Sequence, residues 1–490
     1  MATILVMERP ENWPLEIPGL EVVLARSYLT DPAWSARRGV KVFNVCRSYR
    51  YQSLGYYVSL LAEARGHKPL PSVSTIQDLK TPTVVKVLSE DLEALVQKSF
   101  SDLISNEFTL SIYFGENLAK RYHRISRQLF NLFPAPLLRA QFARRQGLWE
   151  LLGIRPIGAR EIPDPHRPFV IEQTQRYFSG RAPSRPRTTV PRYELAILTD
   201  PNEIHAPSDE RALRRFEDAA EEIGIRADRI TRDDLGRIQE FDALFIRATT
   251  AVNHYTYRFS RRASAEGLVV IDDPDSILRC TNKVFLAELF ARNRIPTPPT
   301  VILHRDNLDQ AIQTLGFPMI LKLPDSSFSQ GVVRVDDREA FEAKARSYLG
   351  GSDLLIAQAF LPTEFDWRMG ILDGEPLFAA RYHMAKGHWQ IIHGDGGTET
   401  RYGGVEAVAL DQVPPGVTDA ALKSAALVGS GLYGVDLKTR DERVYVVEIN
   451  DNPNVDAGYE DKIQGRDVYR RIMASFLARL EARHKREERE

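Results

Sequence analysis

Short apolar runs alternate with helical patterns along about the first 150 residues. Three runs are apolar and too short for typical helices, and they are predicted to be strands: Thr3 to Met7, Glu21 to Ala25 and Val40 to Val45. Three stretches are candidate helices, the first of them with apolar residues at helical spacing: Tyr51 to Ala64, Leu92 to Phe100 and Leu118 to Phe133. We therefore expect residues 1–154 to form an N-terminal α/β domain, in which no motif indicates a role.

Residues 155–192 interrupt this regular pattern and are rich in proline and arginine. The residues concerned are Pro156, Pro163, Pro165, Pro168, Pro183, Pro186, Pro191, Arg181, Arg185, Arg187 and Arg192. This composition predicts an extended linker, or an arm lying on a neighbouring domain. An arm that binds nucleic acid is the alternative, but few aromatic residues are interleaved with the arginines, which counts against it.

A second regular pattern begins at Tyr193. Strands are predicted at Tyr193 to Leu198, Phe241 to Ile246 and Leu268 to Ile271, with a helix from Asp209 to Ile223. The order strand–helix–strand predicts a small parallel sheet within residues 193–275. A helix from Lys283 to Arg292 stops before a group of prolines, and an amphipathic helix begins at Asp467 and runs into a charged tail at residues 481–490.

Composition excludes several classes of protein. A chain of 490 residues predicts about three domains, and a formal net charge of −1 gives no overall attraction to nucleic acid or membrane. We find no apolar stretch long enough to span a bilayer, and the first apolar run is too short for a signal peptide. Cys46 and Cys280 are far apart, so a cysteine-rich zinc site and a disulfide framework are excluded. A reducing cytoplasm is the expected location.

Three oxygen-bearing side chains near the C-terminus are predicted to share one surface. Glu448 and Asn450 are two residues apart, so a strand directs both to the same face. A hairpin that turns around Asp441 would bring Asp436 opposite Glu448. Two carboxylates and an amide oxygen suit a hard cation such as Mg²⁺, which also relieves the repulsion between the carboxylates. The alternative is an ordinary exposed hairpin whose polar residues lie on its solvent-facing side.

Two lysines upstream are candidates for binding phosphate. Lys283 opens a helix, where its charge adds to the positive end of the dipole unless an anion lies nearby. Lys322 ends an apolar strand and is followed by a loop of small residues, whose backbone N–H groups could enclose phosphate oxygens. The residues of the candidate loop are Ser326, Ser327, Ser329, Gln330 and Gly331. A solvent-facing lysine and a plain hairpin turn are the alternatives.

The order of these motifs resembles the RimK-like ATP-grasp carboxylate–amine ligases. The resemblance covers roughly Tyr193 to Asp461 and includes Asp366 and Arg381 between the lysines and the hairpin. The run from Asn450 to Asp461 is similar to a subgroup that has an extra N-terminal domain. The loop after Lys322 departs from the family pattern, since it has serines where family members often have glycines.

The resemblance implies an α/β multidomain protein with an ATP-grasp fold. A pre-ATP-grasp domain (193–275) and an ATP-grasp domain (276–480), whose two α+β subdomains enclose ATP, would follow the separate N-terminal α/β domain. Adenine would lie at the strand exit around Gln358, Phe360 and Leu361, and Asp366 would bind the ribose hydroxyls. Two Mg²⁺ ions, which Mn²⁺ could replace, would bridge the phosphates at Asp436, Glu448 and Asn450.

The resemblance further implies an ATP-dependent, ADP-forming ligase that makes an amide bond through an acyl phosphate. Arg368, Arg381 and Lys386 would stabilise the charges that develop during transfer, and Asn452, Asn454 and Asp456 would contact the amine substrate. Amino acids, peptides or a protein terminus are the expected substrates, and the family habit suggests a homo-oligomer. The alternatives are a small-molecule kinase of the same fold and a nucleotide-dependent regulatory or RNA-associated protein.

Overall fold

The computed structural model divides into two compact units, residues 1–194 with 233–241 and residues 195–232 with 242–490. The residues it describes are 2–9, 13, 20–37, 39–81, 85, 92–179, 191–325, 331–385, 389–390, 392–394 and 400–487. Among the helices in these ranges, we find none that is both long enough and apolar enough to cross a membrane.

The first unit begins with a parallel sheet of strand order β2-β1-β3-β4. Its strands are β1 (Thr3–Met7), β2 (Glu21–Leu24), β3 (Lys41–Asn44) and β4 (Lys68–Leu70). Its helices are α1 (Ala25–Thr30), α2 (Pro32–Ala36), α3 (Leu54–Ala64) and α4 (Val73–Asp78). The three strands and the first helix predicted in this region are confirmed to within a few residues, because their apolar residues form a buried core.

An antiparallel sheet of order β5-β6-β7 completes this unit and was missed by the sequence analysis. Its strands are β5 (Glu107–Tyr113), β6 (Leu137–Arg145) and β7 (Leu148–Pro156), and the neighbouring helices are α6 (Glu93–Phe100) and α7 (His123–Leu132). Phe100 lies at the centre of the packing, with ring centroids 4.7 Å from Phe142 and 5.5 Å from Trp149. Such aromatic contacts between residues far apart in the sequence stabilise the strands, and no local pattern predicts them.

The predicted linker at 155–192 contains regular structure in its described part, which corrects that expectation. Strand β7 continues to Pro156, and helix α8 (Arg167–Ser179) follows two 3₁₀ turns. Pro156, Pro163 and Pro165 come before the helix, and Pro168 is in its first turn, where the missing N–H is tolerated. Tyr177 and Phe178 then pack edge-on against Phe43, at 5.8 and 4.7 Å between centroids. Residues 180–190, including Arg181, lie outside the described residues.

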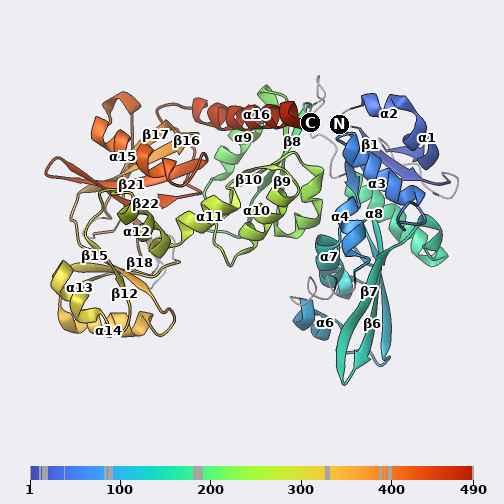
Figure 1. Ribbon diagram of the computed structural model, residues 1–490, viewed down its shortest axis with the longest axis horizontal. Helices are drawn as coiled ribbons and strands as arrows, with labels where there is room; N and C mark the ends of the chain where they lie inside the picture. Colours follow the sequence, from blue (N-terminus) through green and yellow to red (C-terminus); the bar gives the residue numbers. More distant parts are fainter. Residues whose placement is uncertain are drawn as a thin grey trace. The chain divides into compact units, whose positions relative to one another are not determined.

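The second unit begins with a sheet of order β11-β10-β8-β9, in which β10 is parallel to β8 and β11. Its strands are β8 (Tyr193–Leu198), β9 (Ile225–Ile230), β10 (Ala243–Ile246) and β11 (Val269–Ile271), as the sequence predicts for all but β9. The helices are α9 (Glu210–Glu222), α10 (Tyr255–Ala265) and the C-terminal α16 (Asp467–Glu487), which extends through much of the expected tail. Figure 1 shows α16 beside α9, where Tyr469 packs against Phe216.

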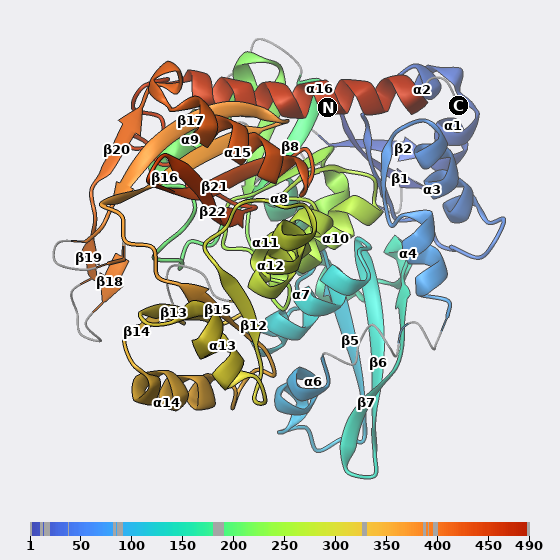
Figure 2. The same cartoon turned by 60° about the vertical axis from the view of Figure 1, so that its left-hand side comes forward.

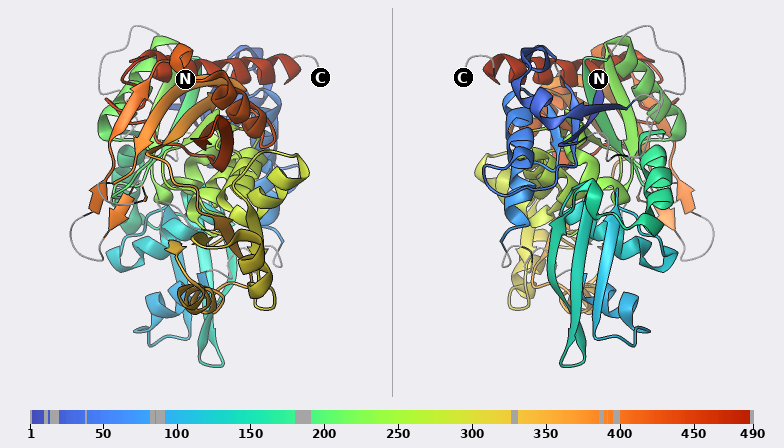
Figure 3. Two further views of the ribbon diagram at one scale, coloured as in Figure 1. Left: turned by 90° about the vertical axis from the view of Figure 1, so that its left-hand side faces the viewer. Right: turned by 90° about the vertical axis from the view of Figure 1, so that its right-hand side faces the viewer.

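Helices α11 (Pro274–Thr281) and α12 (Lys283–Arg292) lead into an antiparallel sheet of order β12-β15-β13-β14. Its strands are β12 (Thr300–Leu303), β13 (Met319–Lys322), β14 (Val332–Val335) and β15 (Leu355–Ala359), and its helices are α13 (Leu308–Leu315) and α14 (Arg338–Tyr348). The apolar faces of sheet and helices share one core around Leu321 and Phe341. The left view of Figure 3 shows this layer in yellow and brown.

A five-stranded antiparallel sheet of order β20-β17-β16-β21-β22 forms the last layer. Its elements are β16 (Phe365–Leu372), β17 (Glu375–His383), β20 (Val405–Val408), β21 (Leu432–Arg440), β22 (Arg443–Asn450) and helix α15 (Pro415–Ala426). A separate ribbon pairs β18 (Ile392–Gly394) with β19 (Thr400–Tyr402). Helix α15 covers one face of the sheet, where Trp367, Met369 and Leu437 are buried (Figure 2).

Candidate active site

The face of the five-stranded sheet opposite its buried core is polar. Residues alternate between the faces of a strand, so the neighbours of Trp367 and Leu437 in sequence lie on this polar face. The residues that share it are Asp366, Arg368, Tyr382, Asp436, Lys438, Glu448 and Asn450. Asp436 is paired with Glu448 across β21 and β22, which confirms the predicted hairpin, and Asp441 and Glu442 form the turn with φ of 49° and 62°.

The two candidate carboxylate ligands of a metal are each paired with a cation. Arg368 donates from Nε and Nη2 to the two oxygens of Asp436, and the Nη2–Oδ2 distance is 2.9 Å. Burial raises the pKa of Asp436, and Arg368 opposes that shift. Lys283 Nζ lies 3.2 Å from Glu448 Oε1. Burial would raise the pKa of Glu448, but Lys283 and Lys322 outweigh it and hold that pKa below its usual range.

Asn450 completes the candidate metal set. Its amide nitrogen is 3.3 Å from Asp436 Oδ2, so the carbonyl oxygen of the same amide reaches this cluster after a flip of the group. Gly434, which is paired with Asn450, lets Pro453 approach the strand closely, because a Cβ at Gly434 would lie 2.7 Å from Pro453 Cβ. Two carboxylates and an amide on one face form a donor set that fits Mg²⁺.

Lys283 and Lys322 reach the same place from the other layers. Lys283 is the first residue of α12, and its backbone N–H donates to Pro324 just after β13 (2.9 Å). Lys322 Nζ donates to Gln358 Oε1 (2.9 Å), and the Gln358 amide donates to Thr300 Oγ1 (2.9 Å). Burial lowers the pKa of Lys322 to about 8, with Lys283 and Lys438 adding to the shift and Glu448 opposing it.

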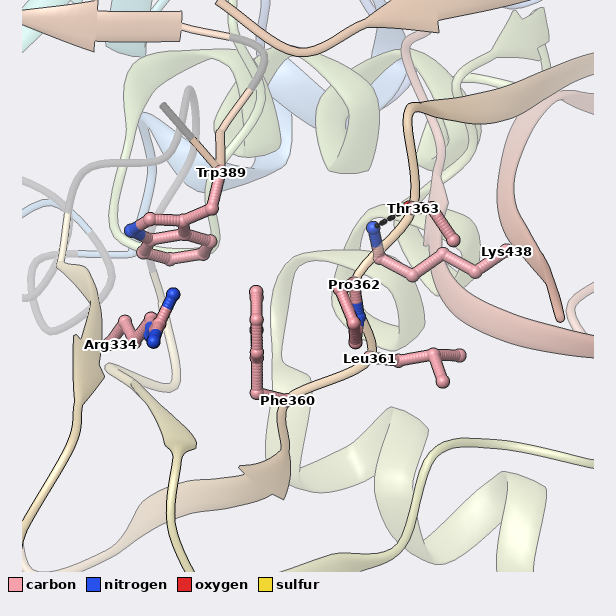
Figure 4. Close-up of a pocket in the computed structure, with 7 residues that line it drawn as sticks. All are labelled: Arg334, Phe360, Leu361, Pro362, Thr363, Trp389 and Lys438. Carbon is pink, nitrogen blue, oxygen red and sulfur yellow. Dashed lines mark hydrogen bonds between the residues drawn. The ribbon is translucent and has the colours of Figure 1, made fainter. Parts of the chain in front are cut away.

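A cavity of about 360 Å³ lies beside Lys438 of the polar face (Figure 4). The residues that line it are Arg334, Phe360, Leu361, Pro362, Thr363, Trp389 and Lys438. Trp389 lies edge-on to Phe360, with centroids 6.0 Å apart, and the Arg334 guanidinium lies 4.5 Å from the Phe360 centroid. The volume and the aromatic lining suit a flat heterocycle with an attached polar group.

The structure does not bring Arg381 to this face, which corrects its expected place beside the γ-phosphate. Arg381 is paired with Trp367 across β16 and β17, so the strand directs it to the opposite face. There its guanidinium lies 5.0 and 4.9 Å from the ring centroids of Phe365 and Trp367, and 3.6 Å from Glu406. Tyr382, the next residue, lies on the polar face instead, and its hydroxyl donates to Glu460.

The predicted amine-contacting residues are engaged in holding their own loop. Asn452 accepts from Arg247 (2.6 Å) and donates to the Ala248 carbonyl (2.8 Å). Asp456 accepts from the Asp209 N–H at 2.7 Å, and the Asn454 amide donates to Asp456 at 3.3 Å. Internal contacts therefore occupy both polar ends of the Asn452 amide, and contact of these three residues with an amine substrate stays a prediction.

The predicted phosphate loop lies only partly within the described residues. Gly331 closes its base, since its carbonyl accepts from the Leu323 N–H (3.0 Å) and its φ is 71°. The remaining predicted residues of the loop, Ser326, Ser327, Ser329 and Gln330, lie outside the described residues, as does Lys386.

Two residues of the site were missed by the sequence analysis. Lys438 lies two residues after Asp436, and the alternation of the strand would have found it. Arg247 is buried at the end of β10 and donates to the Pro453 carbonyl (2.9 Å) and to Asn452, so it holds the loop that follows the metal candidates. No local pattern marks Arg247, because its partners lie more than 200 residues away in sequence.

Lysines of α12 and β13 that meet carboxylates and an amide of β21 and β22 are typical of an ATP-grasp protein. The model of the RimK-like ATP-grasp domain matches residues 280–476, and that of the RimK-like ATPgrasp N-terminal domain matches residues 25–173. Together they match more than half of the chain, which belongs to the RimK-like ATP-grasp family.

Several named proteins are similar to this chain. A probable alpha-L-glutamate ligase of Thioalkalivibrio sulfidiphilus is 26% identical over 242 residues, which are 48% of this chain and 76% of the relative. A ribosomal protein bS6–L-glutamate ligase of Salmonella paratyphi B is 27% identical over 48% of this chain and 77% of its own. The protein is therefore an ATP-using ligase of the class that forms carbon–nitrogen bonds.

Two solved structures are similar to part of this chain. The D-alanine–D-alanine ligase of Bacillus anthracis covers 60% of this chain and 99% of its own, with 16% identity and a TM-score of 0.47. A RimK domain ATP-grasp protein of Sphaerobacter thermophilus covers 58% and 98%, with 18% identity and a TM-score of 0.44.

Proposed function

We propose that this ligase transfers the γ-phosphoryl group of ATP to a substrate carboxylate and then joins the resulting acyl phosphate to an amine, releasing ADP and phosphate. The observation that supports this most directly is the convergence of two lysines, Lys283 and Lys322, on Glu448, which is paired with Asp436 across the hairpin. Binding of a nucleotide alone would not require paired carboxylates beside the phosphate-binding lysines, whereas phosphoryl transfer does.

The nucleotide would lie with its base in the cavity and its phosphates against the two lysines. Phe360 and Trp389 offer the base aromatic contacts, and Leu361 lines the same cavity. Lys322 is buried, and its ammonium donates to a neutral group among the described residues, the Gln358 amide oxygen, so a charged phosphate oxygen is a better acceptor.

Asp436, Glu448 and Asn450 would hold Mg²⁺. No cluster of three His, Cys, Asp or Glu side chains suited to a metal ion occurs in the described part of the chain, so the amide and the phosphate oxygens would complete the site. Bound Mg²⁺ would supply positive charge to the transferring phosphoryl group. Asp436 must exchange Arg368 for that ion, which leaves the Arg368 guanidinium on the polar face to hold the acyl phosphate and the charge of the tetrahedral intermediate.

The substrates we propose are an amino acid as the amine and a peptide or protein terminus as the carboxylate. The support comes from the relatives, which are named as ligases of L-glutamate, one of them acting on a ribosomal protein. L-Glutamate is therefore the first amine to test.

The test measures ADP and phosphate release with Mg-ATP against a panel of amino acids and peptides, with product masses read in parallel. A product lighter by one water than the sum of acid and amine would support ligation and identify both substrates. A phosphorylated product with no amine incorporated would contradict the proposal and indicate a kinase. The Glu448→Gln variant is the negative control.

A further inference from the structure

The strongest unassigned feature lies in the first unit, in the loop between β3 and α3 (residues 45–53). The loop leaves the carboxyl end of β3, beside that of β1, because the two strands are parallel neighbours with Val6 paired to Asn44. Strands β2 and β3 lie on opposite sides of β1, so the strand order reverses between β1 and β3. In open parallel sheets, ligands bind outside the carboxyl ends of the strands at such a reversal.

The backbone of this loop is held firmly. Tyr49 is buried, and its hydroxyl donates to the Asn44 carbonyl (2.6 Å). Ser53, the N-cap of α3, donates from its hydroxyl to the Ser48 carbonyl (2.7 Å) and from its N–H to the Arg50 carbonyl (2.9 Å). A loop that is already fixed loses little conformational entropy when a ligand binds to it.

The exposed side chains of the loop are not used by the fold. Arg47 and Arg50 are exposed, and Tyr51 is 68% exposed. Within the described ranges, none of these three side chains forms a hydrogen bond or an ion pair. Two arginines therefore keep all their guanidinium donors for a ligand.

Three tyrosines and a lysine extend this surface onto the neighbouring helices. The ring of Tyr51 lies 5.2 Å from that of Tyr56, and Tyr56 lies 5.7 Å from Tyr57, which is 38% exposed. Lys80, just after α4, places its Nζ 5.9 Å from the Tyr56 centroid. We call the set of Arg47, Arg50, Tyr51, Tyr56, Tyr57 and Lys80 the α3 surface.

Positive charge is concentrated in the part of the chain that carries the α3 surface. Residues 1–194 contain 27 Lys and Arg against 18 Asp and Glu, a formal charge of +9, whereas the remaining residues contain 38 against 48, a charge of −10. The near-zero total therefore conceals a basic N-terminal part. An acidic partner is attracted to this part and repelled by the charge of the other.

The chemistry of the α3 surface suits an acidic peptide better than a nucleic acid. Arginine binds a carboxylate through two parallel hydrogen bonds, and tyrosine offers a peptide a large contact area at a low cost in side-chain entropy. The planes of the three rings are inclined by 59° (Tyr51 and Tyr56) and 67° (Tyr56 and Tyr57). Rings inclined in this way do not present parallel faces to successive bases of a single strand.

We propose that the α3 surface docks an acidic segment of the peptide or protein whose carboxylate the ligase activates. Arg47 and Arg50 pair with side-chain carboxylates of that segment, and Tyr51 packs against its chain. The identity of the partner rests on the proposed function, but docking itself requires neither ATP nor Mg²⁺.

The test measures docking by fluorescence anisotropy with the full-length protein in the absence of ATP. The probes are a labelled peptide of about ten residues that alternates glutamate with alanine, and its counterpart with glutamine in place of glutamate. The wild-type protein is expected to bind the glutamate peptide at least about tenfold more tightly than the glutamine peptide.

Two variants and a matched control locate the contact. Arg47→Gln/Arg50→Gln should weaken binding of the glutamate peptide about tenfold, and Tyr51→Ser should weaken binding of both peptides by a similar factor of about three. Lys120→Gln/Arg124→Gln also removes two exposed charges from the first unit and should change the dissociation constant by less than about twofold.

Three results would overturn the inference. The first is wild-type protein that binds both peptides equally well or not at all. The second is an equal loss in Arg47→Gln/Arg50→Gln and Lys120→Gln/Arg124→Gln, since net charge alone would then explain binding. The third is a single-stranded oligonucleotide of the same charge that binds more tightly than the peptide and loses this affinity in Arg47→Gln/Arg50→Gln, which would identify a nucleic-acid surface. If that variant does not fold, Tyr51→Ser and the two peptides decide.

Failure of docking and failure of the proposed function are distinguishable. The Glu448→Gln variant should dock the glutamate peptide as tightly as wild type, because Glu448 lies in the second unit at the candidate metal site. Peptide-dependent ADP release without docking at the α3 surface would refute only this inference. Docking without ADP release from any acid and amine of the panel would count only against the proposed function.

Discussion

Nucleotide affinity is expected to fall as the pH rises from 7 to 9, because Lys322 loses its proton in this range. Burial lowers the pKa of Lys322 to about 8, and the nearby Lys283 and Lys438 oppose its charge further. A phosphate binds the protonated ammonium far better than the neutral amine. The perturbation is therefore a change of pH alone, with Lys322→Arg as the variant that keeps its charge throughout.

The magnitude follows from the titration of one group. With a pKa of about 8, Lys322 is about nine-tenths protonated at pH 7 and about one-tenth protonated at pH 9. If only the protonated form binds phosphate, the dissociation constant rises about tenfold between these values, which corresponds to about 1.4 kcal/mol.

The same shift affects the stability of the nucleotide-free protein. A lysine in the unfolded chain has a pKa of about 10.4, so the unfolded state holds more protons than the folded state between pH 8 and 10. The free energy of unfolding therefore rises with pH in this range.

Calorimetric titration with Mg-ADP at pH 7, 8 and 9 provides the assay. Lys322→Arg is expected to bind with little change across this range, and Lys322→Met is expected to bind weakly at every pH. Chemical denaturation of the nucleotide-free protein measures the effect on stability. The free energy of unfolding of the wild type is expected to rise by about 3 kcal/mol between pH 8 and 10.5, relative to that of Lys322→Met. An equal pH dependence of ADP binding in wild type and Lys322→Arg would refute this account of Lys322.

Three further outcomes are expected. Glu448→Gln should reduce ADP release at least about 100-fold while leaving the thermal unfolding temperature within a few degrees, and near-normal turnover would remove Glu448 from the site. Arg381→Met should change kcat and the KM for ATP by less than about threefold, because Arg381 lies on the Trp367 face, and a loss as large as that of Arg368→Met would show that it reaches the phosphates. Arg247→Met should lower the free energy of unfolding by about 3–5 kcal/mol in urea titrations, because Asn452 and two carbonyls lose a buried charged donor; an effect below about 1 kcal/mol would contradict that role.

Much of the second unit could be predicted from local pattern. The helix that Lys283 opens ends at Arg292 in both prediction and structure, and the strand pairing of Asp436 with Glu448 follows from their spacing around the turn. These two predictions succeed because helix capping and the alternation of side chains along a strand are local properties. The same alternation, carried two residues further, would have identified Lys438.

The contacts that local pattern does not predict are those made with a distant partner. Arg381 has a suitable charge, but its pairing with Trp367 directs it away from the polar face. Asn452 and Asp456 have suitable groups, but Arg247 and the Asp209 N–H already occupy them. The strands β5 to β7 and helix α8 were missed for the same reason, since aromatic contacts across the chain stabilise them.

The sequence by itself therefore determined the elements of the second unit that carry the candidate site, the class of the protein and the chemistry of the candidate metal and phosphate residues, because each of the motifs involved is local. Only the tertiary structure decided that Arg368 and Lys283 neutralise Asp436 and Glu448 before any ligand binds, and that Lys438 lies beside Asp366 at the cavity. Side-chain charges act over a few ångströms, and the chain brings these groups within that distance only when its layers pack together.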